Sequence, residues 1–405
     1  MIDNAHQDGF DFGSLRRFPD VEAPNLFASD ASDRLILADA AAALEGLDDG
    51  GLAIVGDRYG ALTLAAASLY GVRGIRVHQD AMSAELALRN NAELLGNAGL
   101  LGTAVLLENP ELPANPEPPG QPAVFRQLPL GEDLFSGAKV VLWQLPRGLD
   151  ELAEVADQIA RHAHPDVRVF AGGRLKHMTT SMNGVLSESF GNVRAGLARQ
   201  KSRVLTATDP IRSGAAPRFP VREFNAELGL WLCAHGATFA GTRLDVGTRY
   251  LLEFLDRMKP DARTAVDLGC GSGVIAAVLA ATRPQLQVTA TDQSAAAVAS
   301  AAATAAANGM ADRISAVRDD AMAAFPAASA ELILLNPPFH IGATVYAGAA
   351  IKLFDAAARV LAPSGELWTV YNNHLDYRSQ LERRIGPTVV HGRNAKFTVV
   401  ASVRR

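Results

Sequence analysis

The sequence predicts an α/β protein made of two tandem domains, each a mostly parallel, twisted sheet with helices on both faces. Two observations support this prediction. Short apolar runs alternate with longer helical patterns in both halves of the chain, which is typical of parallel sheets with crossover helices. The two halves also resemble one another. A length of 405 residues suits two or three domains, each with a core of its own.

The internal repeat is in register. A strand, a glycine loop, a helix and a second strand are expected over residues 52–78 and again over 265–292. Gly56 precedes Gly269 by 213 positions, and the last glycines of the two loops are separated by the same interval. A later pair of strands, which end near Gln144 and Asn336, are 192 positions apart. The first half therefore carries 21 extra residues, which we assign to a proline-rich loop at 109–129.

The first copy has lost the residues expected to carry chemistry. Its loop reads Gly-Asp-Arg-Tyr-Gly where the second copy has Gly-Cys-Gly-Ser-Gly, and Arg58 and Tyr59 would crowd a cofactor. We therefore expect a degenerate domain at 1–193, a basic connecting segment at 194–222 and a catalytic domain at 223–405.

Composition excludes several classes of protein. Lys and Arg number 38 against 43 Asp and Glu, which gives a formal net charge of −5 and argues against a generic polyanion binder. The two cysteines, Cys233 and Cys270, cannot form a disulfide framework or a four-cysteine zinc site. No apolar run is long enough to span a membrane, and the first residues do not resemble a secretory signal, so a cytoplasmic location is expected.

The glycine loop of the second half predicts a ligand site at a helix N-terminus. The segment Asp267-Leu-Gly269-Cys-Gly271-Ser-Gly273 lies between an expected strand and an expected helix, where free backbone N–H groups point outward. A dinucleotide loop requires glycine at the sixth position, which is Val274 here, so NAD is disfavoured. Asp292 ends the next strand and is placed to accept hydrogen bonds from ribose hydroxyls.

A second candidate element is Asn336-Pro337-Pro338-Phe339, which follows an apolar run. Two prolines fix the backbone and lack N–H donors, so the carbonyl groups of Asn336 and Pro337 can accept hydrogen bonds. An amide oxygen beside a backbone carbonyl suits a planar –NH2 group, and Phe339 offers a face on which a base can stack.

Together these motifs resemble class I S-adenosylmethionine-dependent methyltransferases, which have Rossmann-like domains and modify exocyclic or amide nitrogens. The segment from His235 to Thr248 resembles the small-domain ribosomal RNA methyltransferases that act on the guanine 2-amino group and contain a degenerate N-terminal copy. Leu15-Arg-Arg-Phe-Pro19 and Asn373-His-Leu-Asp-Tyr377 look most like the large-subunit (23S) member.

The resemblance implies a set of site residues. Asp267, Gly269, Gly271 and Gly273 would line the methionine part of S-adenosylmethionine, Asp292 its ribose and Asp320 its adenine amino group. Asn336, Pro337 and Phe339 would hold the target base. The amine lone pair is delocalised into the ring, so the mechanism is expected to depend on orienting that lone pair toward the sulfonium methyl, without a metal. Ala240 and Arg243 depart from the family pattern in the expected target loop.

A local basic patch supports an RNA substrate. Residues 194–222 contain seven basic side chains and one acidic one, and we expect Arg199, Lys201 and Arg203 to contact RNA. Several alternatives remain open at this stage: a 16S rRNA guanine 2-amino methyltransferase, an adenine 6-amino or protein glutamine methyltransferase, and a non-catalytic RNA-binding assembly factor. An intact cofactor loop disfavours the last.

Overall fold

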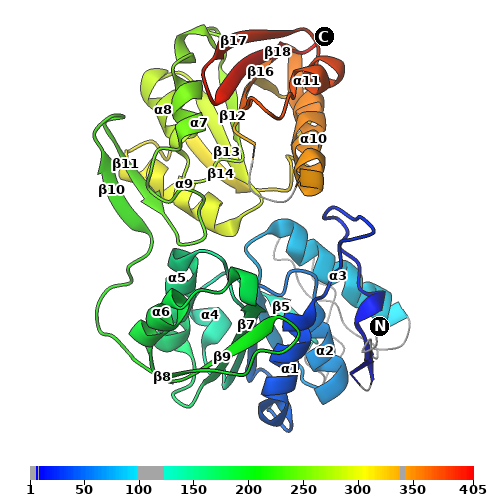
Figure 1. Ribbon diagram of the computed structural model, residues 1–405. Helices are drawn as coiled ribbons and strands as arrows, with labels where there is room; N and C mark the ends of the chain where they lie inside the picture. Colours follow the sequence, from blue (N-terminus) through cyan, green and yellow to red (C-terminus); the bar gives the residue numbers. More distant parts are fainter. Residues whose placement is uncertain (1–5, 8, 98–122, 338–342) are drawn as a thin grey trace. The chain divides into compact units, whose positions relative to one another are not determined.

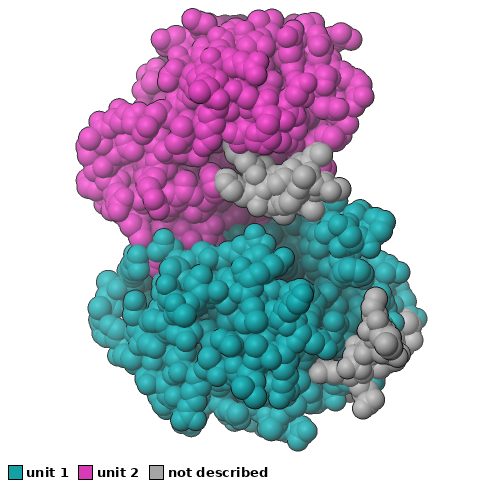
Figure 2. Space-filling view, viewed as in Figure 1, with its two compact units in different colours: residues 1–218 teal, residues 219–405 magenta. Residues whose placement is uncertain are grey.

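The structure is a computed structural model that describes residues 6–7, 9–97, 123–337 and 343–405. The chain divides into two compact units, residues 1–218 and 219–405 (Figure 2). Each unit is built around a seven-stranded sheet (Figure 1). Most of the proline-rich stretch expected to be a loop lies outside the described residues.

The sheet of the N-terminal unit has the strand order β5-β4-β3-β6-β7-β9-β8. The first five of these strands are parallel, whereas β9 pairs antiparallel with both of its neighbours. The strands are β3 (Leu52–Val55), β4 (Ile75–His78), β5 (Phe125–Gln127), β6 (Val140–Gln144), β7 (Arg168–Arg174), β8 (Phe190–Ala195) and β9 (Ser202–Pro210). A short pair, β1 (His6–Gln7) and β2 (Phe10–Asp11), precedes them.

Helices cover both faces of this sheet, because its strands alternate in the direction of their apolar side chains. Leu52 and Ile54 of β3 pack with the helices α1 to α3, while Ala53 and Val55 pack with α4 to α6 on the other face. The helices are α1 (Ala31–Leu44), α2 (Ala61–Tyr70), α3 (Met82–Asn97), α4 (Glu132–Phe135), α5 (Leu149–His162) and α6 (Ser181–Ser189), with 3-10 turns η1 (Phe12–Ser14) and η2 (Leu175–His177).

The sheet of the C-terminal unit repeats this arrangement in the order β14-β13-β12-β15-β16-β18-β17. Here β18 pairs antiparallel with both of its neighbours, as β9 does in the N-terminal sheet. Its strands are β12 (Thr264–Leu268), β13 (Gln287–Asp292), β14 (Ile314–Arg318), β15 (Ala330–Leu335), β16 (Leu361–Asn372), β17 (Thr388–Arg393) and β18 (Phe397–Val403). The two sheets confirm the predicted pair of Rossmann-like domains.

Helices again lie on both faces. The first cluster of buried residues includes Leu251 of α7 and side chains of α8 and α9, and the second includes residues of α10 and α11. These helices are α7 (Val246–Leu252), α8 (Val274–Thr282), α9 (Ala295–Ala307), α10 (Ala343–Val360) and α11 (Arg378–Arg384), with the 3-10 turn η3 (Leu255–Arg257). No helix within the described ranges is both long and apolar enough to cross a membrane.

A two-stranded ribbon, β10 (Val221–Asn225) and β11 (Leu230–Ala234), packs on α9 of the C-terminal unit. The side chain of Asn308 holds its second strand by accepting from the Trp231 backbone N–H and donating to the Trp231 carbonyl. The structure thus places much of the segment 194–222 in regular strands, with β9 inside the N-terminal sheet. The sequence had indicated only a connection there.

Candidate active site

The predicted site residues of the second half gather at one edge of the C-terminal sheet. Asp267 lies near the end of β12, Asp292 ends β13, Asp320 follows β14, and Asn336 follows β15. These four strands are parallel neighbours, so their carboxyl ends meet at the same edge. That edge is where open parallel α/β sheets bind their ligands.

The loop between β12 and α8 has a backbone that requires glycine. Gly269, Gly271 and Gly273 have φ values of 74°, 52° and 76°, in the left-handed region that other residues seldom adopt. A Cβ atom on Gly273 would also stand 2.8 Å from the Cα of Ala301 in α9. The glycines therefore form the turn and allow α8 and α9 to approach closely. As at the start of any helix, the first backbone N–H groups of α8 have no acceptor within the helix.

Asp267 is fully buried at the base of this loop. Its Oδ2 accepts the Ala276 backbone N–H of α8 at 3.0 Å, whereas its Oδ1 has no partner among the described residues. The pKa of this carboxyl is raised to about 7, mainly by burial and also by the nearby charge of Asp292, against the lowering effect of the Ala276 hydrogen bond. A positive charge bound near this buried carboxyl group would favour its ionised form.

Asp292 links the second strand to the glycine loop. Its Oδ2 accepts the Gly271 N–H at 3.2 Å, and its Oδ1 accepts the Ser294 N–H at 3.0 Å. Asp292 therefore also holds the loop, in addition to the ribose contact predicted for it.

The acidic pair after β14 divides into two roles. Asp319 is buried, and its two carboxylate oxygens accept the backbone N–H groups of Ala323 and Ala324 at 2.6 and 2.9 Å. Asp320 forms an ion pair with Lys352 of α10. Asp319 accordingly stabilises the turn, whereas Asp320 faces the partly exposed ammonium group of Lys352.

Asn336 has a fixed amide orientation. Its Nδ2 donates to Asp245 Oδ2 at 2.9 Å and to Thr248 Oγ1 at 3.0 Å, so both amide hydrogens are used. Its Oδ1 is buried and has no donor among the described residues. Asp245 is the N-cap of α7 and accepts the N–H groups of Gly247 and Thr248. The start of α7 therefore fixes the amide so that its oxygen remains an available acceptor.

Pro337 is buried directly after Asn336. Phe339, which we expect to stack on the target base, lies outside the described residues, so its role stays a prediction. Arg199 and Lys201 lie at the turn between β8 and β9, and Arg203 lies in β9, so all three belong to the N-terminal unit.

Asp245 and Thr248 are the site residues that the sequence motifs did not identify. Both lie in the segment that suggested the family, yet neither was given a role. The available signal was an aspartate directly before a helical pattern, which is a common N-cap. Nothing in the sequence indicates that the same carboxylate also holds an asparagine 91 positions later.

Comparison with known proteins adds independent findings. The methyltransferase small domain family matches residues 229–401, and the RLMG N-terminal domain family matches 4–117 and 112–210. A solved structure of the 16S rRNA N2 methyltransferase of T. thermophilus, in complex with AdoMet and guanosine, superposes with a TM-score of 0.69 at 19% identity. It covers 95% of this chain and 97% of that one, and it supports the fold.

Curated relatives extend over nearly the whole chain. The ribosomal RNA large subunit methyltransferase G of Streptomyces avermitilis is 33% identical over 97% of both chains. That of Shewanella amazonensis is 30% identical over 96% of both, and that of Ectopseudomonas mendocina is 36% identical over 68% of this chain and 73% of its own. This identity over nearly the whole length shows that the chain belongs to the ribosomal RNA large subunit methyltransferase G family.

Proposed function

We propose that this protein uses S-adenosylmethionine to methylate the exocyclic 2-amino group of a guanine in 23S ribosomal RNA. The observation that carries the proposal is the state of Asn336: both hydrogens of its amide are held by α7, and its buried Oδ1 is left as an acceptor. Such an oxygen recognises an N–H group. Family membership supplies the RNA class, since the relatives are named as large-subunit enzymes.

The residues around the glycine loop fit S-adenosylmethionine. Gly269, Gly271 and Gly273 would lie along its methionine part, and a Cβ on Gly271 would have nothing nearer than 4.0 Å. The unpartnered Oδ1 of Asp267 suits a positively charged ligand, because a cation would favour ionisation of this buried carboxyl group. Asp292 would hold the ribose, and Asp320 the adenine amino group. When bound, the cofactor supplies an electrophilic methyl group.

The part of the protein in this reaction is to orient the 2-amino group of guanine. The 2-amino nitrogen of guanine is a weak nucleophile, because its lone pair is delocalised into the ring. Asn336 Oδ1 and the Pro337 carbonyl would accept its two hydrogens, favour a more tetrahedral nitrogen and direct the lone pair outward for attack on the methyl carbon. As the N–C bond forms, the methyl–sulfur bond would break with its electron pair leaving on sulfur, and the nitrogen would lose one of its two protons to water. The base would leave its stack to reach this site and would be held there by Phe339.

The N-terminal unit would position the RNA. Arg58 and Tyr59 occupy its degenerate loop, and Arg199, Lys201 and Arg203 place positive charge on the β8–β9 side of its sheet. These three side chains would contact phosphate groups, which gives affinity without sequence specificity.

Substrate competition tests the proposal. The full chain is incubated with labelled S-adenosylmethionine and, in separate reactions, unmodified 23S rRNA, 16S rRNA, DNA and a ribosomal protein mixture. We expect label in 23S rRNA and, at most, traces elsewhere. Preferential labelling of 16S rRNA would contradict the assignment to the large subunit, and labelling of protein alone would indicate a glutamine methyltransferase.

A further inference from the structure

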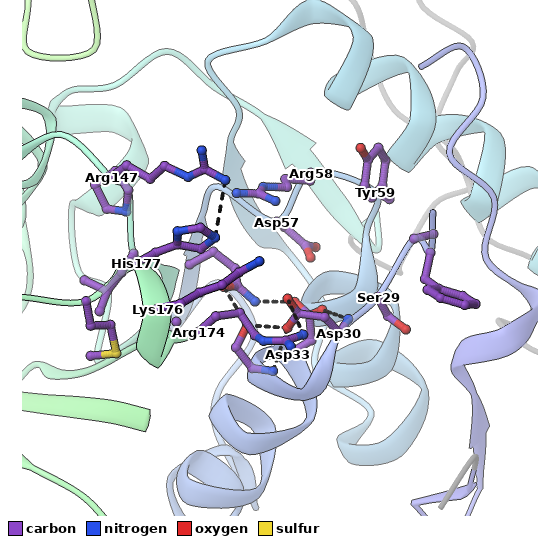
Figure 3. A pocket seen from close by; sticks show the side chains of 18 of the residues that line it. Ser29, Asp30, Asp33, Asp57, Arg58, Tyr59, Arg147, Arg174, Lys176 and His177 are labelled. Carbon is purple, nitrogen blue, oxygen red and sulfur yellow. Dashed lines mark hydrogen bonds and ion pairs between the residues drawn. The ribbon is translucent and has the colours of Figure 1, made fainter. Parts of the chain in front are cut away.

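The N-terminal unit contains a pocket of about 170 Å³ at the carboxyl edge of its own sheet. Its lining comes from the segments that follow β3, β6 and β7 and from the start of α1 (Figure 3). The equivalent edge of the C-terminal sheet holds the candidate active site. The pocket therefore lies where the repeat would place a second reaction centre, and no role follows for it from the proposed function.

The asparagine clamp of the active site has a counterpart here. Gln144 ends β6, the equivalent of β15, and its Nε2 donates to Asp33 near the start of α1. Its Oε1 lies 3.2 Å from Ser32 Oγ, whose single hydroxyl hydrogen is also within reach of Asp30 Oδ1 at a shorter distance. Asn336 Oδ1 has no such neighbour among the described residues. A serine hydroxyl thus stands beside the acceptor that a reacting amine would require, which argues against catalysis in this pocket.

The cofactor side of the pocket is also closed. Tyr59 is buried in the degenerate loop; its Oη donates to Asp20 Oδ2 at 2.6 Å, and the guanidinium of Arg17 lies 4.6 Å from its ring. Both carboxylate oxygens of Asp57 accept hydrogen bonds from the start of α2. The buried acidic groups are thus satisfied by the protein itself, and they are not available to an incoming ligand.

The groups left at the pocket mouth are cations. Arg58, Arg147 and Lys176 come from three different loops, are exposed, and point toward one another in Figure 3. None of them forms an ion pair with a carboxylate anywhere in the described part of the chain. Arg147 lies 3.3 Å from Nε2 of His177, and burial together with the neighbouring cations lowers the pKa of that histidine. Three convergent, unpaired positive charges favour an anion.

Two further features favour RNA as the source of that anion. The Leu175 backbone N–H, next to Lys176, donates to the Lys201 carbonyl at 2.9 Å, so the pocket adjoins the turn that carries Arg199 and Lys201. In addition, Phe27 lines the pocket with 73% of its surface exposed, so its ring offers a stacking face for a base. A phosphate site beside an aromatic face matches one nucleotide of a single strand.

We propose that this pocket of the degenerate unit binds a phosphate group of ribosomal RNA between Arg58, Arg147 and Lys176, with the adjoining base on Phe27. This inference rests on the proposed function, because it assumes an rRNA substrate. The pocket then has a binding role of its own in the N-terminal unit. It holds a nucleotide of the substrate other than the methylated one.

Binding and turnover measured separately test this inference. The full chain, the triple variant Arg58→Ala/Arg147→Ala/Lys176→Ala and the control Arg168→Ala are titrated with labelled 23S rRNA fragments at several salt concentrations. Arg168 is an exposed arginine at the first residue of β7, at the opposite edge of the same sheet. Methyl transfer at saturating RNA and the affinity for S-adenosylmethionine are measured in parallel.

We expect the triple variant to bind RNA about 10- to 100-fold more weakly and to lose roughly 0.7 to 0.9 units of slope in log affinity against log salt, the contribution of one phosphate contact. Phe27→Ala should weaken binding without changing the slope. Cofactor affinity and the saturated rate should stay unchanged. Equal losses in Arg168→Ala, or no loss in the triple variant, would overturn the inference.

Three further outcomes separate the possible failures. Tight binding of GMP or inorganic phosphate alone, lost in the triple variant, would assign the pocket to a free ligand instead of RNA. If the chain binds 23S rRNA through the pocket but methylates no guanine, the proposed function fails while the pocket's role stands. If it methylates guanine and the triple variant binds RNA normally, only the pocket inference fails.

Discussion

Arg58 and Gly271 adopt the same backbone conformation at equivalent positions of the two units, with φ values of 56° and 52°. The flanking glycines agree as well: Gly56 and Gly60 have φ values of 72° and 94°, in the same region as those of the second loop. The degenerate loop has therefore kept the path of a cofactor loop while an arginine replaces its central glycine. A left-handed arginine carries a local backbone cost, typically of about 1 kcal/mol or more.

The first prediction concerns Asn336. Asn336→Ala removes the acceptor proposed for the 2-amino group and should lower the rate of methyl transfer by about 100- to 1000-fold, with unchanged affinity for S-adenosylmethionine. Single-turnover kinetics and calorimetric titration measure the two quantities. Asn308→Ala is the control, since the Asn308 amide is likewise held by hydrogen bonds, but to Trp231 of β11 and Thr304 of α9. Near-normal turnover by Asn336→Ala would contradict its role.

The second prediction concerns Asp245, which positions Asn336. Asp245→Ala loses both the helix cap and the acceptor for Asn336 Nδ2, so we expect a slower saturated rate, by about tenfold, together with a loss of roughly 1 kcal/mol in stability. Asp245→Asn keeps an oxygen at the same place and should restore both. A purely structural role would leave the saturated rate of the folded Asp245→Ala protein unaltered.

Part of the fold and of the candidate site could be predicted from the sequence. The alternation of strands and helices, the glycine loop and the position of Asn336 at a strand end follow from apolar periodicity and the internal repeat, because these are local patterns. The pairing of Asn336 with Asp245, and of Gln144 with Asp33, joins segments 91 and 111 positions apart and appears only when α7 and α1 pack beside their sheets.

The expectation for residues 194–222 shows a different limit. Its charge suggested a surface segment between domains, yet residues 202–210 form an antiparallel strand inside the N-terminal sheet. This strand packs on both faces of the sheet: Val204 is buried in one cluster and Leu205 and Ala207 in the other, while basic side chains occupy the turn before it. Charge counting alone does not distinguish a linker from a strand with one polar edge.

A third prediction concerns the ribose side of the cofactor site. Asp292→Ala removes both the predicted ribose contact and the hydrogen bond that holds Gly271, so we expect affinity for S-adenosylmethionine to fall by about 10- to 100-fold. Affinity for RNA should not change. Calorimetry with each ligand tests this, with Asp312→Asn as an exposed carboxylate control. Loss of RNA affinity without loss of cofactor affinity would contradict the assignment.

A fourth prediction follows from the pKa of Asp267, which burial raises to about 7. A raised pKa means that the folded protein binds this proton more tightly than the unfolded chain does. The resulting stability is complete below about pH 4 and is lost as the pH rises through about 7. Asp267→Asn should therefore reduce the decline in the free energy of unfolding between pH 5.5 and 8 by roughly 1–3 kcal/mol, as measured by denaturant unfolding. An identical pH dependence in wild type and variant would contradict the shift.

The most direct test of the central claim is to identify the methylated nucleoside. The full chain is reacted with S-adenosylmethionine and unmodified 23S rRNA, the RNA is digested completely, and its nucleosides are separated and weighed by mass spectrometry. The account predicts 2-methylguanosine, formed far more slowly when Asn336→Ala replaces the wild type. A product methylated at the adenine 6-amino group, or at any position other than the guanine 2-amino nitrogen, would contradict it.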